Sequence, residues 1–128
     1  MIPDSLHYTK THEWVRREEG TRATVGIAHH AQAELKDIVF VELPTVGKTL
    51  TAGQACAVVE SVKAAFDIYA PLSGTVVTVN QALVTTPQLI NQDCYGQGWF
   101  FVLEASQPAE WEKLLPSSAY AALLATTR

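Results

Sequence analysis

A chain of 128 residues, 48% hydrophobic and 17% charged, is long enough to bury a core and too apolar to be intrinsically disordered. The net charge of −4, with no block of basic residues, excludes the electrostatic surface of a nucleic-acid-binding protein. The opening MIPDSLHYTK lacks the apolar stretch of a secretory signal, and no apolar run is long enough to span a bilayer. We therefore expect a cytoplasmic protein that has no membrane partner.

The first third of the chain predicts two short strands and then a helix. Residues 12–17 and 22–27 are β-type runs, and the REEGT between them is a turn in which Gly20 can adopt a positive φ. Residues 28–35, AHHAQAEL, are rich in good helix formers. A short helix is therefore expected after the second strand.

The middle of the chain predicts a series of short strands separated by turns. DIVFVEL, residues 37–43, is a strong β-type run that Pro44 ends. The later β-type runs are bounded by glycines and cover residues 48–50, 55–60, 65–70, 75–79 and 99–104. Many short strands with regular turns are typical of a sandwich or a small barrel, so we expect a mainly β fold.

The C-terminal segment, about residues 108–127, changes to a helical pattern. Pro108 can occupy the first position of a helix, and Ser117 and Ser118 are capping candidates for a second helix, AYAALLA. No linker or low-complexity stretch interrupts the chain, so we expect a single domain over residues 1–128.

The cysteines and histidines do not form a recognisable reactive site. Cys56 and Cys94 lie 38 positions apart, without metal or redox spacing, and are expected to be small buried hydrophobes. The four histidines include no HExxH motif, and the adjacent His29 and His30 would point in different directions on a helix. We expect no metal site and no catalytic residue, and an enzyme in its own right is the less favoured alternative.

Lys63 occupies an unusual place between two β-type arms. CAVVE and FDIYA flank the short SVKAA, so a hairpin would hold Lys63 at or next to its turn. A lysine there is ordinarily just a solvated surface residue. Lysine also offers a primary amine on a flexible four-carbon stem, which can enter the active site of another enzyme and be acylated. Position alone does not decide between these interpretations.

The residues around Lys63 are similar to the biotinyl/lipoyl attachment pattern. The similarity lies in the spacing of Gly47 and Gly53, in Glu60-Ser-Val-Lys63-Ala, and in Ile-Tyr-Ala-Pro-x-x-Gly74. Over about residues 8–120 the chain resembles the glycine cleavage H-protein family. The motifs that carry this resemblance are YTKTHEWV, VGIAHHAQAEL, DIVFVELPTVG and NQDCYGQGWF.

The resemblance implies a lipoyl carrier. The fold would be a barrel-sandwich hybrid of short antiparallel strands, with a short helix after the second strand and C-terminal helices. Lipoate would be attached to Lys63 through an amide bond, and Glu60 and Gly74 match positions that lipoate-attaching enzymes read. The carrier would need a rigid base for its mobile arm, which a stiff β-scaffold supplies.

The same resemblance implies three enzyme partners. The pyridoxal-phosphate-dependent glycine decarboxylase (P protein) would load an aminomethyl group onto a lipoyl sulfur. The aminomethyltransferase (T protein) would pass the one-carbon unit to tetrahydrofolate and free ammonia. Dihydrolipoamide dehydrogenase (L protein) would then reoxidise the dithiol, and the chain itself would only carry.

The resemblance also implies a cleft that shelters the loaded arm. Glu13 and Asp67 match acidic positions of this cleft and Thr11 matches a neighbouring polar one, which suits a protonated amine because charge-assisted hydrogen bonds are strong. Both carboxylates could instead be merely solvated strand residues. The chain departs from the usual pattern at Phe66, where a small residue is common, at Cys94, where Pro is common, and at Lys36, where Gly is common.

Four alternatives differ from this interpretation. A biotin carrier usually has Met on both sides of its lysine, whereas Lys63 has Val62 and Ala64. A lipoyl domain of a 2-oxoacid dehydrogenase usually reads Asp-Lys-Ala within a long multidomain chain. An H-like carrier could relay lipoyl or octanoyl groups to other lipoate-dependent enzymes. A plain binding module would leave Lys63 unmodified.

Overall fold

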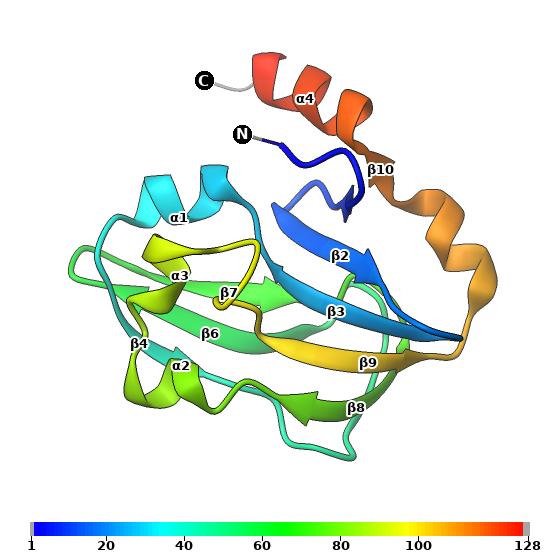
Figure 1. The fold of residues 1–128 in the computed structure, drawn as a ribbon, viewed down its shortest axis with the longest axis horizontal. Helices are drawn as coiled ribbons and strands as arrows, with labels where there is room; N and C mark the ends of the chain where they lie inside the picture. Colours follow the sequence, from blue (N-terminus) through cyan, green and yellow to red (C-terminus); the bar gives the residue numbers. More distant parts are fainter. Residues whose placement is uncertain (1, 127–128) are drawn as a thin grey trace.

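The structure, a computed structural model, describes residues 2–126 as two antiparallel β-sheets with short helices around them (Figure 1). The larger sheet has the strand order β10-β1-β2-β3-β9-β8-β5 and the smaller one β4-β6-β7. The strands of the larger sheet are β1 (His7–Tyr8), β2 (Glu13–Arg17), β3 (Arg22–Ile27), β5 (Thr49–Leu50), β8 (Gly74–Val79), β9 (Phe101–Ala105) and β10 (Leu115–Pro116). Those of the smaller sheet are β4 (Ile38–Glu42), β6 (Ala55–Ser61) and β7 (Ala65–Tyr69).

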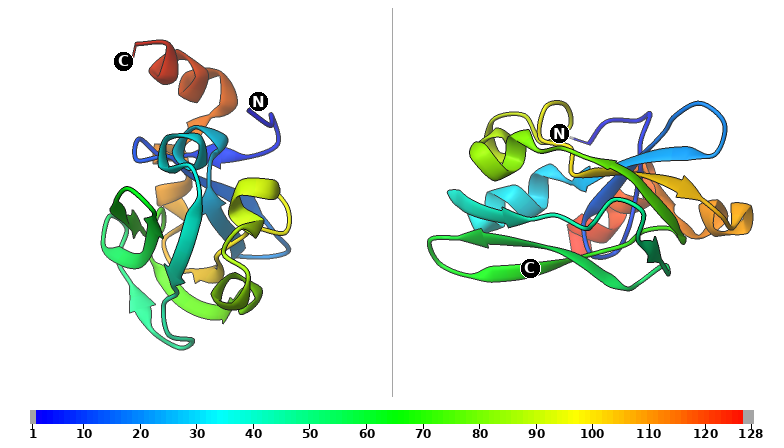
Figure 2. Two further views of the ribbon diagram at one scale, coloured as in Figure 1. Left: turned by 90° about the vertical axis from the view of Figure 1, so that its left-hand side faces the viewer. Right: turned by 90° about the horizontal axis from the view of Figure 1, so that it is seen from below.

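The helices are short and lie at the ends of the sheets. They are α1 (His29–Leu35), α2 (Ala82–Thr85), α3 (Leu89–Gln92), the 3₁₀ helix η1 (Pro108–Lys113) and α4 (Ser117–Thr126). Figure 2 shows α4 standing outside the two sheets, on the same side as the N-terminal segment. Among residues 2–126, no helix combines the length and the apolar character needed to cross a membrane.

The expected mainly β fold is confirmed, and the predicted strands form within two residues of their expected ends. The helix expected after residues 22–27 also forms, as α1. Four elements were not anticipated: β1 and β10 have two residues each, and α2 and α3 have four each, too short for a periodic signal.

The C-terminal segment is helical in a different way from the expectation. Pro108 opens a 3₁₀ helix rather than an α-helix, and the chain then extends and pairs Leu115 with Tyr8 of β1. The helix ends at Lys113 because Leu114 already has an extended backbone, with φ −76° and ψ 153°. Leu115, which precedes Pro116, is disfavoured in the α conformation and continues the extended segment. The second helix forms as α4, but it begins at Ser117, so Ser117 and Ser118 are its first residues rather than caps before AYAALLA; position 127 of the expected segment lies outside the described residues.

The main core lies between the two sheets. Val25 and Leu103 of the larger sheet and Val59 and Ile68 of the smaller one are at most 4% exposed and belong to one hydrophobic cluster. Burying such side chains is the main favourable contribution to folding. Because the small sheet is held against the large one, the hairpin formed by β6 and β7 has a firm base.

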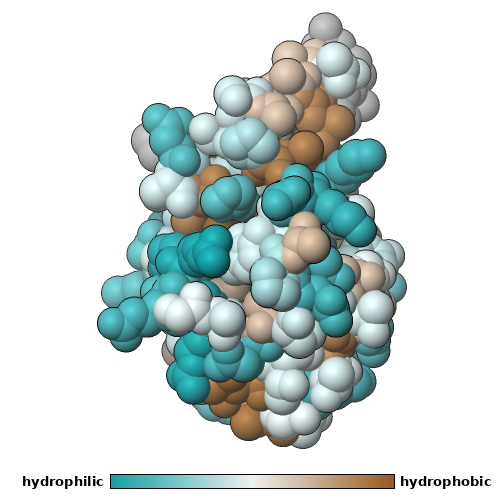
Figure 3. Space-filling view, turned by 90° about the vertical axis from the view of Figure 1, so that its right-hand side faces the viewer, coloured by the Kyte–Doolittle hydropathy of each residue, from teal (hydrophilic) through white to brown (hydrophobic). Residues whose placement is uncertain are grey.

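A second cluster attaches α4 to the body of the protein. Tyr120 of α4 stacks on Tyr8 with ring centroids 4.5 Å apart and planes 2° apart, and both rings are fully buried beside Trp14. A Cβ at Gly26 would lie 2.5 Å from the Trp14 ring, so only glycine at this position lets the indole pack against β3. In the view of Figure 3, hydrophobic atoms gather under the protruding C-terminal helix and at the opposite end of the molecule.

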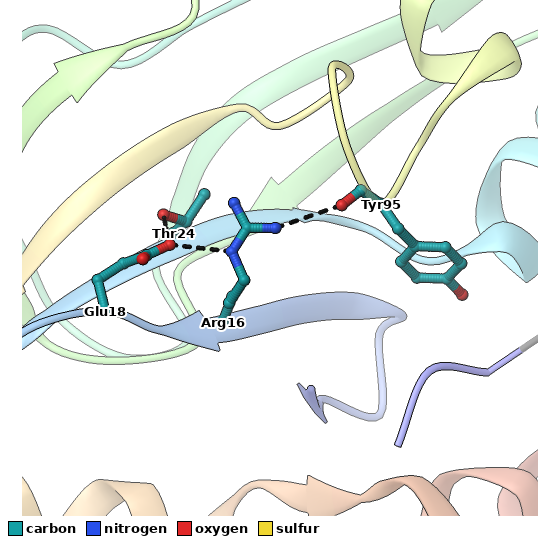
Figure 4. Close-up of polar contacts among 4 residues, drawn as sticks. All are labelled: Arg16, Glu18, Thr24 and Tyr95. Atoms are coloured by element: carbon teal, nitrogen blue, oxygen red, sulfur yellow. Dashed lines mark hydrogen bonds and ion pairs between the residues drawn. The ribbon is translucent and has the colours of Figure 1, made fainter. Parts of the chain in front are cut away.

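The segment NQDCYGQGWF is held against β2 and in turn holds α1. Trp14 Nε1 donates to the Cys94 carbonyl at 2.8 Å, and Arg16 Nη1 donates to the Tyr95 carbonyl at 3.3 Å. Figure 4 shows this arginine also paired with Glu18, which accepts a hydrogen bond from Thr24. The Tyr95 hydroxyl accepts the His29 N–H at 2.9 Å, at the start of α1. This network fixes α1, which forms one wall of the candidate site.

Candidate functional site: an exposed lysine beside a cavity

Lys63 lies in the turn between β6 and β7 and is exposed. Figure 1 shows this turn at its left edge. Ser61 builds this turn: its Oγ accepts the backbone N–H groups of Lys63 and Ala64, each at 3.1 Å. The Ser61 N–H donates to the Ala64 carbonyl at 2.8 Å, and the Val62 N–H donates to the Asp37 carbonyl at 3.3 Å. The backbone that carries the amine is therefore fixed while the four-carbon stem is free to move.

Glu60 and Gly74 lie in different surroundings. Glu60 is half-buried and stands in register between Phe40 and Ala65 on the small sheet, next to the turn. Gly74 is buried at the start of β8, paired with Leu50 and Ala105, and a Cβ there would lie 2.3 Å from the Glu104 carbonyl oxygen. Gly74 therefore has a packing reason to be glycine, and its recognition by attaching enzymes stays a prediction.

Glu13 is almost completely buried, 1% exposed, and its carboxylate is surrounded by donors. The hydroxyl groups of Thr9 and Thr11 both donate to Oε1. The Tyr69 N–H donates to Oε2 at 3.1 Å. Buried carboxylates need such partners, and here they connect the segment before β2 to the free edge of β7.

A cavity of about 260 Å³ lies between α1 and β7, and we call it the α1 cavity. Its apolar lining consists of Ile27, Ala31, Leu35, Val59, Phe66 and Ile68. Its polar lining consists of Thr11, His12, His30, Glu34 and Asp67. An apolar wall with a few polar groups is the usual make-up of a site for a small organic group.

The three residues of the expected cleft come together only in part. Thr11 and Asp67 both line the α1 cavity, whereas Glu13 lines a neighbouring cavity of about 530 Å³ that extends toward η1. Thr11 lines both cavities and its hydroxyl donates to Glu13 at 2.5 Å. Asp67 is exposed, unlike the buried Glu13.

Sequence reasoning missed His12, His30 and Glu34 as residues of this site. The rings of His12 and His30 lie 4.5 Å apart, and His12 Nδ1 is 2.7 Å from the Tyr120 hydroxyl of α4. Burial and then His30 lower the pKa of His12, while Glu34 acts in the opposite direction. The available signal was the four-residue spacing of His30 and Glu34, which places both on one face of the predicted helix.

The two cysteines have no reactive character. Cys94 is buried as expected, whereas Cys56 is only partly buried and its thiol donates to the Ile68 carbonyl at 3.4 Å. Burial raises the pKa of Cys56 to about 12 and that of Cys94 to about 11, so neither forms a thiolate readily. Within residues 2–126, no group of three or more His, Cys, Asp or Glu residues could hold a metal ion.

Comparison with known proteins gives one consistent result. Residues 6–127 match the family model described as "Glycine cleavage H-protein". The "Glycine cleavage system H protein" of Shewanella oneidensis is 55% identical over 123 residues, covering 96% of this chain and 95% of the relative. That of Cronobacter sakazakii is 57% identical with the same coverage.

The solved structures give the same answer. The crystal structure of a glycine cleavage system H protein from Mycobacterium marinum superposes with a TM-score of 0.85 at 39% identity, over 97% of this chain and 99% of that one. A family model that covers nearly the whole sequence, with a solved structure of the same fold, defines the membership of the chain. The chain belongs to the glycine cleavage H-protein family.

Proposed function

We propose that this protein is the lipoyl carrier of a glycine cleavage system, with lipoate amide-linked to the Nζ of Lys63. The observation that carries the proposal is the exposed Lys63 on a turn that Ser61 holds in place, in a chain of this family. Lipoate supplies a dithiolane whose sulfur can accept an aminomethyl group and then be reoxidised. The residues around the lysine would accommodate the arm and bind its cargo.

The dimensions of the α1 cavity suit such an arm. A lipoyl-lysine of roughly ten single bonds reaches about 10–15 Å from the backbone. An extended chain spans at most about 3.3–3.6 Å per residue, so Asp67, four residues after Lys63, lies within about 14 Å of it. The end of an arm laid along the edge of β7 therefore comes to the α1 cavity, which Phe66 and Asp67 line.

The chemistry of the lining also suits the cargo. Apolar side chains from β3, α1, β6 and β7 offer contact to the hydrocarbon and sulfur part of the arm. Asp67 and Glu34 offer carboxylates to a protonated amine, and Thr11 offers a hydroxyl that Glu13 orients. These residues would hold the amine and exclude water from it while the carrier moves between enzymes.

In this function the chain is not a catalyst. It would receive the aminomethyl group of glycine at a pyridoxal-phosphate-dependent decarboxylase and deliver it to a tetrahydrofolate-dependent aminomethyltransferase. Dihydrolipoamide dehydrogenase would reoxidise the dithiol. Glu60, beside the turn, and Gly74 are our candidates for recognition by the lipoate-attaching enzymes.

Mass spectrometry of the intact protein, from cells supplied with lipoate, tests the attachment. We expect one lipoyl increment, located on the peptide containing Lys63 and absent from Lys63→Arg. Reconstitution with the partner enzymes tests the role, because lipoylated protein should support glycine-dependent release of CO2. A lipoylated protein that fails this assay would instead indicate a carrier that relays acyl groups to other lipoate-dependent enzymes.

A further inference from the structure

Phe66 is exposed although it occupies an inward-facing position of the small sheet. In the register of this sheet, Val41 pairs with Val59 and Val59 pairs with Phe66, so the three side chains share one face. Val41 is 3% exposed and Val59 is 0% exposed, whereas Phe66 is 53% exposed. Phe66 therefore lies on the same face of the sheet as the core residues Val41 and Val59 but, unlike them, is not covered by other side chains.

The reason for this exposure is the α1 cavity. β7 is an edge strand in the order β4-β6-β7, so no further strand covers Phe66 on its outer side. The ring lines the cavity together with Leu35 of α1 and the core residue Val59. A large apolar side chain facing a cavity presents a surface that gains from an apolar occupant.

We propose that Phe66 determines how tightly the α1 cavity holds the arm, by packing its ring against the two sulfur atoms of a lipoyl group on Lys63, both in the oxidised dithiolane and in the reduced dithiol. The inference rests on the proposed function. Phe66 lies three residues from Lys63, at most about 11 Å away, which is within the reach of the sulfur end of the arm. Sulfur at the edge of an aromatic ring makes a favourable contact, and the ring also keeps solvent from the sulfurs.

The experiment measures how fast the reduced arm reacts with iodoacetamide, a small uncharged reagent. A lipoyl thiolate displaces iodide, so one S–C bond forms, one C–I bond breaks and the thiol proton goes to the buffer. The proteins are lipoylated, checked by intact mass and reduced before the reaction, and alkylation is followed by mass spectrometry. The comparison uses the unchanged protein, Phe66→Ser, Phe66→Leu and Val62→Ser.

Val62→Ser is the matched control. Val62 is 75% exposed and adjacent to Lys63, but it does not line the α1 cavity. We expect Phe66→Ser to react roughly two- to ten-fold faster than the unchanged protein, the range that a sulfur–aromatic contact provides. Phe66→Leu should fall between the two, and Val62→Ser should react at the unchanged rate.

The possible failures are distinguishable. Equal rates for Phe66→Ser and the unchanged protein, both lipoylated, would overturn this inference and leave the carrier function intact. Equal acceleration by Val62→Ser would also overturn it, because the effect would then come from the turn. Absence of the lipoyl increment from Lys63 in the unchanged protein would overturn the proposed function and this inference together.

Discussion

Replacing Gly74 with alanine separates packing from enzyme recognition at this position. An alanine Cβ would lie 2.3 Å from the Glu104 carbonyl oxygen and 3.0 Å from Ala105 Cα, both on the neighbouring strand β9. These are backbone atoms, so relief requires β8 and β9 to move apart by about 1 Å to reach a normal contact distance. Their pairing in this region would be disturbed.

The magnitude follows from two opposing effects. Inserting a methylene-sized group into a packed region costs about 1–3 kcal/mol. Replacing glycine reduces the conformational entropy of the unfolded chain, which stabilises by about 0.4–1 kcal/mol. At the middle of both ranges the net destabilisation is about 1.3 kcal/mol, which for a chain of this size lowers the thermal midpoint by about 5 °C.

Thermal and urea unfolding of Gly74→Ala measure this change, with Gly20→Asn as the control. Gly20 has a φ of +64° and a Cβ added there would meet no atom within 4 Å, and asparagine tolerates this conformation. An unchanged midpoint for Gly74→Ala would refute the packing argument. A lowered midpoint with normal lipoylation of the folded variant would show that packing, not recognition, requires glycine here.

Three further predictions concern the turn and the charged groups. Ser61→Ala should speed amide hydrogen exchange at Lys63 and Ala64, because both N–H groups lose the Ser61 Oγ acceptor; unchanged exchange at these two amides would contradict the description of the turn. The pKa of His12 is lowered in the folded protein, so the unfolded chain takes up a proton at a higher pH than the folded one. The neutral His12 therefore contributes fully to stability above pH 6.5, the ordinary pKa of histidine. This contribution is lost as the pH falls through the lowered pKa of the folded state. His12→Asn, which suits the φ of +76°, should therefore show a smaller fall of thermal midpoint between pH 7.5 and about pH 5 than the unchanged protein, and parallel curves would count against this assignment. Glu13→Gln should destabilise the fold by about 1–2 kcal/mol in urea unfolding, because charge-assisted bonds become neutral ones, whereas Asp67→Asn should stay within about 0.5 kcal/mol.

The sequence predicted those parts of the fold that depend on local pattern. The segments 22–27 and 55–60 contain β-branched residues and are bounded by turn residues. The strands observed there begin and end within one residue of the predicted ends. The turn that carries Lys63 follows from the two β-type arms on either side. Local preference determines both features, and the tertiary structure agrees with it.

The parts that depend on long-range packing were not predictable in this way. The position of α4 is set by the Tyr8–Tyr120 stack and by the hydrogen bond between Tyr120 and His12, residues 108 positions apart. The α1 cavity depends on how α1 packs beside β7, which no periodicity specifies. His30 and Glu34 were therefore not recognised as its lining.

The two acidic residues expected to form one cleft have different physical roles. Glu13 is buried, and its two oxygens already accept hydrogen bonds from Thr9, Thr11 and Tyr69. Three of the roughly four acceptor sites of this carboxylate are occupied, so it mainly holds its neighbours in place and has at most one site left for a new donor. Asp67 is exposed and lines the α1 cavity, so its charge is available there. We infer that Asp67 binds the amine of the cargo and that Glu13 positions Thr11. Substitution of Glu13 should therefore lower the stability of the fold, whereas substitution of Asp67 should weaken the protection of the loaded arm and leave the stability nearly unchanged.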